Sequence, residues 1–229
     1  MSTVAVLQSN YVPWKGYFDI IHDVDTFVFY DDVQFTKNDW RNRNRIKTAQ
    51  GVRWLSVPVG AHIGRTIREV AIPDARWQRK HYETLRQSYS KAPRFRDVEP
   101  FLEEVYLERA WDNLSALNRF LIERIARDFL GIATRFDDSS RYALAGTGQE
   151  RLLAQLAAVG ATTYVSGPSG RNYMDVAQFE RRGIRVVFKD YSGYPEYPQL
   201  HPPFEHRVSI LDLLFHAGRD APRYIWGPP

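Results

Sequence analysis

The first thirty residues carry the pattern that most constrains the fold: a buried strand, a loop, a helix and a second strand in direct succession. Residues 3–7 form a short run rich in β-branched side chains, as in a buried strand. A polar loop that ends near Pro13 follows, and apolar side chains then recur at helical spacing over residues 14–21. Residues 26–30 have the composition of a second strand. This order predicts a βαβ unit with parallel strands and a right-handed crossover.

The middle of the chain predicts further strands and then a group of helices. The two strands are expected at residues 54–59 and 67–72. Asp74 can cap a first helix, Pro100 suits the first turn of a second, and Gly131 ends a third helix that has one continuous apolar face. We therefore expect a helical insertion from about residue 74 to residue 130.

The last third returns to alternating strands and helices. Thr147 and Glu150 have the spacing of a capping box, and strands are expected at residues 162–165 and 184–188. Ser209 and Asp212 can cap a final apolar helix. The whole pattern predicts a single α/β domain over residues 1–229, with a mainly parallel Rossmann-like sheet flanked by helices and interrupted by the helical insertion.

Composition narrows the function classes. The chain has 229 residues, of which 44% are hydrophobic and 25% charged, so wholesale disorder is excluded. No apolar run approaches the roughly 20 residues of a spanning helix, so we expect no membrane insertion. The chain has no cysteine, which excludes disulfides, zinc–thiolate sites and a cysteine nucleophile. The N-terminus lacks the features of a secretion signal, which predicts a cytoplasmic protein.

Polar side chains cluster where the first two strands are expected to end. Gln8 and Asn10 follow the first strand, and Asp31 and Asp32 follow the second. Ligands of open α/β sheets bind beyond the carboxyl ends of the strands, and amide groups suit sugars. One aspartate is expected to face the site, as a general base or as a partner of a sugar hydroxyl. The alternatives are a buried turn for the loop and structural hydrogen bonds or arginine pairs for the aspartates. The loop residues expected to bind substrate are Gln8, Asn10, Tyr11, Trp14 and Tyr17.

Basic and amide side chains alternate from Arg41 to Lys47. In an extended chain the cations share one face and the asparagines the other. Because guanidinium groups suit phosphate oxygens, this pattern predicts a grip on a diphosphate or nucleotide, with Trp40 stacking on a base or sugar. A solvated basic edge is the alternative, and a nucleic-acid surface would need a broader basic area than the net charge of +4 suggests. The expected binding residues here are Trp40, Asn42, Arg43, Asn44 and Arg45.

A glycine-containing loop at residues 166–170 follows an expected strand and precedes a helix. Gly167 and Gly170 permit close backbone approach, and consecutive N–H groups can bind an anion. Ser169 does not stand in a nucleophile elbow, and the loop lacks the Lys-Ser/Thr ending of a Walker loop. A plain βα turn is the alternative. The expected binding residues of this loop are Ser166, Gly167, Ser169 and Gly170.

The histidines supply candidates for a proton acceptor. The chain has six of them, at positions 22, 62, 81, 201, 206 and 216, and none has the spacing of metal ligands, so no metal site is expected. His81 is the first candidate proton acceptor, because a histidine can change charge near neutral pH, and His201 is the second. His81 shares a helix face with Trp77 and Leu85, so a packed structural histidine is the alternative.

Three longer stretches carry a family resemblance. They are residues 8–19 (QSNYVPWKGYFD), residues 31–47 with DDVQF and DWRNRNRIK, and residues 166–173 (SGPSGRNY) together with YPQL at 197–200 and SILDLLF at 209–215. The chain resembles the WbqC-like family over nearly its whole length. Gln34 and Tyr173 lie in these stretches and are expected to belong to the substrate site. Many family members have His-Gln-Pro where this chain has Leu7-Gln8-Ser9, so no role of that histidine is carried over.

The resemblance implies a role in bacterial surface-polysaccharide (O-antigen) biosynthesis. The first hypothesis is a transferase that attaches an acyl or aminoacyl group to the amine of a nucleotide-linked amino sugar. His81, Asp31 or Asp32 would accept the proton, and the donor would be a carrier thioester, an aminoacyl-tRNA or a free acid. No cofactor is expected. A non-catalytic ligand-binding or scaffold protein is the second hypothesis and an RNA-binding protein the third.

One expectation about geometry underlies these hypotheses. The front loop, the two aspartates, the arginines and the glycine loop should surround one crevice at the carboxyl edge of the sheet. Aromatic residues make up 14% of the chain, more than a core of this size needs, which makes a homodimer plausible.

Overall fold

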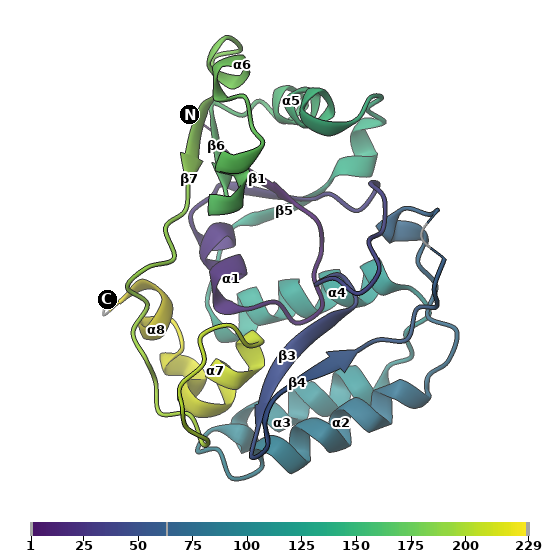
Figure 1. The fold of residues 1–229 in the computed structure, drawn as a ribbon, viewed down its shortest axis with the longest axis vertical. Helices are drawn as coiled ribbons and strands as arrows, with labels where there is room; N and C mark the ends of the chain where they lie inside the picture. The colour runs from purple at the N-terminus through teal and green to yellow at the C-terminus, as the bar shows by residue number, and fades with distance from the viewer. Residues whose placement is uncertain (1, 63, 228–229) are drawn as a thin grey trace.

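A five-stranded parallel sheet organises the molecule (Figure 1). The computed structural model describes residues 2–62 and 64–227. Its strands are β1 (Thr3–Leu7), β2 (Thr26–Phe29), β5 (Arg135–Asp138), β6 (Thr163–Ser166) and β7 (Arg185–Phe188). They lie in the order β5-β2-β1-β6-β7, and every neighbouring pair is parallel. The predicted Rossmann-like α/β class is confirmed.

The strand order reverses between β1 and β6. The chain proceeds outward from β1 through β2 to β5, and then returns to the other side of β1 with β6 and β7. The connections that leave β1 and β6 therefore lead to helices on opposite faces of the sheet. This switch point at the carboxyl edge is where open α/β sheets bind their ligands.

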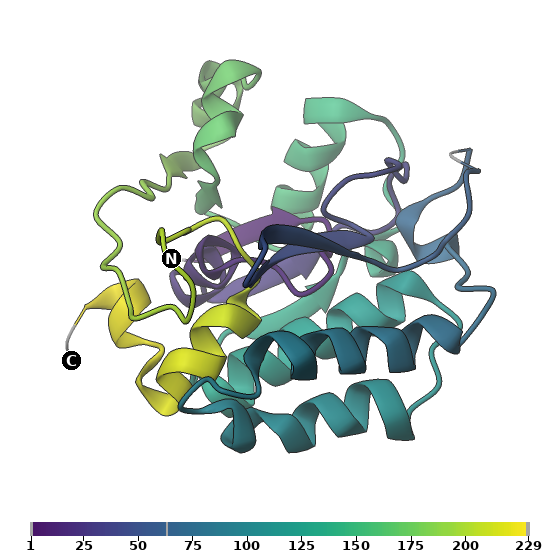
Figure 2. The same ribbon diagram turned by 60° about the horizontal axis from the view of Figure 1, so that its bottom comes forward.

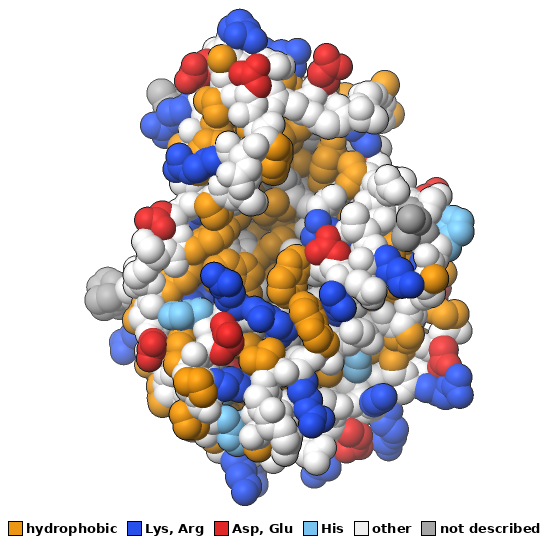
Figure 3. Space-filling model, viewed as in Figure 1, with side chains coloured by type: hydrophobic (Ala, Val, Ile, Leu, Met, Phe, Trp, Pro, Cys, Tyr) orange, Lys and Arg blue, Asp and Glu red, His pale blue; other side chains and the backbone are white. Residues whose placement is uncertain are grey.

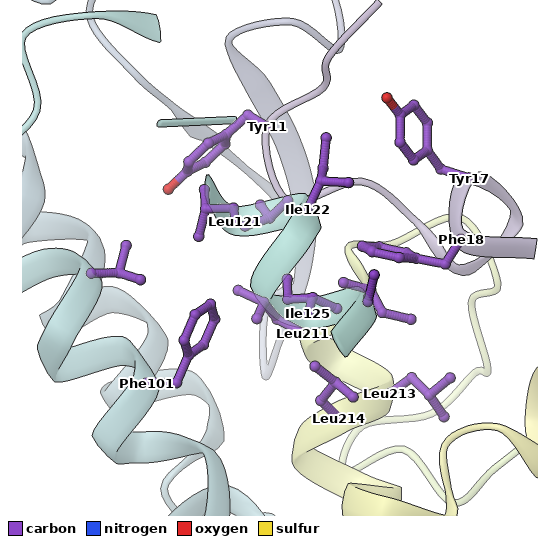
Figure 4. Close-up of a cluster of buried hydrophobic side chains, with 14 of the residues drawn as sticks. Tyr11, Tyr17, Phe18, Phe101, Leu121, Ile122, Ile125, Leu211, Leu213 and Leu214 are labelled. Atoms are coloured by element: carbon purple, nitrogen blue, oxygen red, sulfur yellow. The ribbon is translucent and has the colours of Figure 1, made fainter. Parts of the chain in front are cut away.

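Helices cover both faces of the sheet (Figure 1). Inward side chains of β1 and β2, such as Val4 and Val28, pack with Leu153, Leu156 and Phe179 on one face. These last three belong to α5 (Gly148–Ala158) and α6 (Val176–Glu180). The opposite face carries the larger core, with α1 (Lys15–His22), α4 (Leu114–Arg124) and α7 (Ile210–Ala217). Figure 4 shows Phe18, Leu121 and Leu211 of these helices converging in this core with Ile125, which directly follows α4.

The helices of the insertion lie below the sheet (Figure 2). They are α2 (Arg76–Tyr89), α3 (Phe95–Glu103) and α4, which lie within the range 74–130 expected for the insertion, and β5 follows them in the chain. An antiparallel ribbon of β3 (Arg43–Thr48) and β4 (Gly51–Ser56) lies over α2, where Lys47 N donates to Tyr89 Oη at 2.8 Å. The short helix α8 (Arg223–Trp226) follows α7.

Four local predictions are wrong. Residues 67–72 are not a strand, because Thr66 and Glu69 cap each other and wind Ile67–Glu69 into a 3₁₀ turn. Pro100 lies inside α3, since that helix already begins at Phe95. Thr147 is the N-cap of α5, but its side chain makes no capping hydrogen bond. Asp212 is buried within α7, where it accepts hydrogen bonds from Tyr89 and Tyr197 and caps nothing.

Other boundaries follow the predicted residues. Gly131 adopts a left-handed φ of +65° after a π-helical turn (Ile125–Phe129) that extends α4. Ser209 caps α7 by accepting from the backbone N–H of Leu211. Strand β5 was not predicted, because its sequence Arg-Phe-Asp-Asp has no run of apolar or β-branched residues.

Candidate functional site

A cavity of about 490 Å³ opens beyond the carboxyl end of β1. Figure 3 shows a hollow on this face, with hydrophobic side chains around it and Lys and Arg side chains along its lower edge. The loop after β1, the ribbon strand β3 and the segment at residues 191–207 all contribute to the cavity. Its lining residues are Asn10, Pro13, Trp14, Trp40, Asn44, Arg45, Tyr191, Tyr194, His206 and Arg207.

The loop after β1 is fixed by side chains from the ribbon. Asn44 Nδ2 donates to the carbonyl oxygens of Tyr11 and Val12, at 3.1 and 3.0 Å. The backbone N–H of Tyr11 donates to the carbonyl of Trp40 at 3.0 Å. Val12 has a left-handed φ of 35°, which is rare for a β-branched residue and persists only where the surroundings hold it. The residues of this edge are therefore held in one arrangement before any ligand binds.

Arg41 sets the direction of the two amide side chains in this loop. Its guanidinium group donates to the Asn10 side-chain oxygen at 2.5 Å and to the Gln8 side-chain oxygen. Both amide oxygens are thus engaged, and each amide is left with its NH₂ group free to donate. Asn10 lines the cavity, so it offers hydrogen-bond donors to an acceptor-rich ligand such as a sugar or phosphate.

An aromatic wall closes one side of the cavity. The rings of Trp14 and Tyr191 meet edge to face with centroids 4.9 Å apart, and Tyr194 stacks on Tyr191 at 6.1 Å. Tyr194 Oη donates to Asp19 Oδ2 of α1 at 2.5 Å, which fixes the position of the ring. Such a wall suits the apolar face of a sugar ring or a nucleobase.

Two arginines line the cavity away from the aromatic wall. Arg45 and Arg207 line the cavity, and neither forms an ion pair with a carboxylate among residues 2–62 and 64–227. Arg45 Nε is sealed from solvent and has no hydrogen-bond partner among those residues. Its guanidinium group lies 5.8 Å from the ring centre of Trp40. Because both guanidinium groups line the cavity without a carboxylate partner in the described chain, this edge favours an anionic ligand.

His206 is the histidine of this cavity. Its ring meets Phe204 edge to face at 4.6 Å, and its Nδ1 atom is sealed from solvent without a partner in the described chain. Burial, and then the positive charge of Lys15, lower the pKa of His206 below its ordinary value of 6.5. The imidazole is therefore neutral at pH 7.

His81, the first candidate from the sequence, lies in the interior. Its Nδ1 is 2.8 Å from Tyr11 Oη, which also contacts Tyr106 Oη at 2.6 Å, and Trp77 packs against its ring. Burial lowers the pKa of His81 to about 4. It does not line the cavity, and His201 lines a second, smaller cavity beside Arg53 and Lys91.

The two aspartates after β2 point to opposite sides of the sheet. Asp31 accepts from the backbone N–H of Ser9 at 2.8 Å and from the hydroxyl of Ser115 on α4. Burial raises the pKa of Asp31. Asp32 pairs with Arg151 of α5 and accepts from Ser139. Neither carboxylate lines the cavity, and both have the structural partners that the alternative interpretation anticipated.

The glycine loop lies beside the cavity and does not line it. It forms a 3₁₀ turn over Pro168–Asn172, and the N–H of Gly170 already donates to the carbonyl of Gly167 at 3.1 Å. A Cβ on Gly167 would lie 3.6 Å from Tyr191 Oη, so the loop adjoins the aromatic wall. Ser169 and Tyr173 are exposed.

The remaining predicted residues support the loops around the cavity. Tyr17 donates to the backbone carbonyl of Gln8 at 2.9 Å. Asn42 Nδ2 donates to the carbonyl of Val57 at 3.1 Å. Arg43 lies 4.2 Å from the ring centre of Trp54, and Gln34 is exposed and forms an isolated β-bridge with Thr66.

The structure thus brings together two of the four expected segments, the front loop and the basic strand. The aromatic, proline-rich stretch at residues 191–207 takes the place of the aspartates and the glycine loop. Its tyrosines, with His206 and Arg207, were not predicted as site residues. In the sequence this stretch stands out by its density of aromatic and proline residues, but it has no periodicity that would place it beside β1.

Comparisons with known proteins cover nearly the whole chain. The sequence profile of the WbqC-like protein family matches residues 8–224. A protein of Mycobacterium tuberculosis described as "Uncharacterized protein Rv1507c" is 48% identical over 227 residues, which cover 98% of each chain. No solved structure matches. Within residues 2–62 and 64–227, no helix is long and apolar enough to cross a membrane. The chain belongs to the WbqC-like protein family.

Proposed function

We propose that this protein is a cytoplasmic transferase of bacterial surface-polysaccharide biosynthesis, which attaches an acyl or aminoacyl group to the amine of a nucleotide-linked amino sugar. The observation that carries the proposal is the cavity at the sheet switch point, with an aromatic wall on one side and, on the other, two arginines that form no ion pair within residues 2–62 and 64–227. Family membership supports the polysaccharide context.

The size and lining of the cavity fit such a ligand. A volume of about 490 Å³ lies within the range of small-molecule sites, roughly 300–1,000 Å³. The sugar would lie against Trp14 and Tyr191, with Asn10 donating to its hydroxyl groups. The diphosphate would contact Arg45 and Arg207, whose guanidinium groups match phosphate oxygens.

The chemistry would be direct attack by the sugar amine on the acyl carbon, because the chain offers no cysteine for a covalent intermediate. A C–N bond forms, the bond from the acyl carbon to the donor's sulfur or oxygen breaks, and the amine loses a proton. Holding the amine beside the acyl group supplies much of the rate by proximity. The donor would be an acyl carrier thioester or an aminoacyl-tRNA.

Ligand-induced protection against thermal unfolding tests the proposal. UDP-glucosamine is the probe, and glucosamine alone is the control that lacks the diphosphate. We expect UDP-glucosamine to raise Tm, and the variants Arg45→Met and Arg207→Met to lose most of that shift. Arg79→Met, an exposed arginine of α2, should keep it. No shift for any nucleotide-linked amino sugar of a panel would count against the proposal.

RNA binding is a second candidate, favoured by one exposed surface. Trp40 and Trp54 are 40% and 46% exposed, with ring centres 5.4 Å apart, and Arg43 and Arg45 lie over them. Exposed aromatic rings beside cations bind single-stranded nucleic acid. Binding of a fluorescent oligonucleotide that weakens steeply with salt and is lost in Trp54→Ala would favour this function. A non-catalytic scaffold role would be favoured if the cavity variants kept full biological output.

A further inference from the structure

Two tryptophans of the chain are exposed beside the cavity. Of the six tryptophans, only Trp40 and Trp54 are exposed, and their ring centres lie 5.4 Å apart with the ring planes tilted by 41°. That separation is too small for a third ring to lie between them, so a ligand would contact their outer surface. Because tryptophan is largely buried in most proteins, two exposed indoles in contact indicate a binding surface.

The ribbon of β3 and β4 places cations next to these rings. Trp54 of β4 stands directly opposite Arg45 of β3, so the two side chains share one face, whereas the next residues, Ile46 and Leu55, are buried in the core. Arg43 lies on the same face as Arg45, and its guanidinium group is 4.2 Å from the ring centre of Trp54. Neither strand contains an acidic residue. The outer face of the ribbon therefore combines indole rings with uncompensated cations, which suits a nucleotide.

Arg45 connects this face with the cavity. Arg45 and Trp40 both line the cavity, and Trp54 lies just outside it. The guanidinium group of Arg45 is 5.8 Å from the ring centre of Trp40 and 6.0 Å from that of Trp54. In a nucleotide-linked sugar the diphosphate joins the sugar to the nucleoside. With the sugar against Trp14 and the diphosphate at Arg45, the nucleoside would therefore extend toward the two exposed rings.

We propose that the exposed rings of Trp40 and Trp54 form the nucleobase subsite for the nucleotide-linked sugar. The inference rests on the proposed function and names the part of the site that binds the nucleoside. The base stacks on the outer surface of the rings, and Arg43 and Arg45 add cation contacts. Because Trp40 and Arg45 belong to both the cavity and this surface, a single ligand that spans the two fits better than a separate RNA strand.

Saturation-transfer difference NMR with UDP-glucosamine and the full-length protein tests the subsite. In the wild type we expect both the uracil protons and the sugar-ring protons to receive saturation from the protein. In Trp54→Ala the uracil signal should fall relative to the sugar signal, and the Kd should rise about tenfold, as expected for the loss of one base–aromatic stack. Trp54→Phe, which keeps an aromatic face, should retain most of both.

A matched control removes an exposed apolar side chain elsewhere. Leu107 is exposed, belongs to the π-helical turn Glu104–Glu108 and does not line the cavity. Leu107→Ala should therefore leave the uracil-to-sugar ratio and the Kd unchanged.

The outcomes separate this inference from the proposed function. An unchanged uracil-to-sugar ratio in Trp54→Ala, while UDP-glucosamine still protects the wild type from unfolding, would overturn the subsite and leave the proposed function standing. A short single-stranded RNA that binds through Trp54 without competing with UDP-glucosamine would assign the surface to RNA and also overturn the subsite. Failure of every nucleotide-linked amino sugar of the panel to bind the wild type would overturn the proposed function and this inference with it.

Discussion

Polar residues beside the cavity serve two different purposes. Arg41 and Asn44 donate hydrogen bonds to the loop after β1 and thereby hold Asn10 in place. Arg45 and His206 instead line the cavity, and each also has one ring or guanidinium nitrogen that is sealed from solvent and has no partner in the described part of the chain. The first pair therefore holds the loop, whereas the second pair forms part of the cavity wall. Residue type alone does not separate the two groups, because each contains an arginine.

Asp31 provides a test at this scale. Burial raises the pKa of Asp31 above the ordinary aspartate value of 3.8, so this carboxyl group binds its proton more tightly in the folded protein than in the unfolded chain. That contribution to stability is fully present below pH 3.8 and is lost as pH rises through the folded-state pKa. We therefore expect the free energy of unfolding of the wild type, relative to Asp31→Asn, to fall between pH 4 and pH 7 in urea titrations.

The alanine variant distinguishes structure from catalysis. Asp31→Ala leaves the N–H of Ser9 and the hydroxyl of Ser115 without an acceptor and should cost about 1–3 kcal/mol of stability at pH 7. If Asp31 is catalytic, as the sequence predicted, Asp31→Asn would abolish transfer while the fold stays intact. If Asp31→Asn transferred the acyl group at the wild-type rate, Asp31 would not be a catalytic residue.

At the scale of elements, periodicity and caps predicted most of the sheet and helices. Runs such as residues 3–7 and 26–30 are apolar and β-branched, so their burial could be read directly. Strand β5 could not be predicted in this way, because it contains two aspartates, Asp137 and Asp138. Their carboxylates find partners only in the folded protein, in Tyr142, Arg141 and Arg119. The same holds for the 191–207 segment, which has no regular structure and depends on contacts with α1 and α7.

The glycine loop gives a prediction about packing. A Cβ on Gly170 would lie 2.6 Å from Ser166 Oγ and 3.0 Å from the Phe188 ring, whereas one on Gly167 would meet only Tyr191 Oη at 3.6 Å. We expect Gly170→Ala to lower the free energy of unfolding by about 1–3 kcal/mol and Gly167→Ala to change it by less than about 0.5 kcal/mol. Chemical denaturation measures both, and equal losses would contradict this account of the loop.

At the scale of the whole molecule, the cavity depends on one long connection that returns to the sheet. After β7 the chain passes Trp14, contacts α1 through Tyr194 and Asp19, and reaches α7, where the N–H of Leu200 donates to His216 Nε2 at 3.0 Å. Asp19 also accepts from Trp226 Nε1 at 2.9 Å and pairs with Lys189. One buried carboxylate thus holds three parts of the chain together.

Limited proteolysis tests the dependence on Asp19. In Asp19→Asn the ion pair with Lys189 is lost, and we expect chymotrypsin to cleave after Tyr191 or Tyr194 several times faster than in the wild type. Asp97→Asn is the control, because its only ion pair in the described residues is an exposed one with Arg94. Fragment masses identify the sites. Unchanged rates would show that other contacts hold the segment.

Because this connection comes late in the chain, the sheet is synthesised before the residues that complete the cavity. All five strands have been translated by Phe188, whereas Tyr191, Tyr194, His206 and Arg207 come afterwards, and Ser209 anchors α7 beneath them. When only the residues up to Phe188 have left the ribosome, the sheet can be complete, but the tyrosines of the aromatic wall are still missing from the cavity. The cavity is therefore completed only by the last stretch of the chain to be translated, after all strands of the scaffold that carries it.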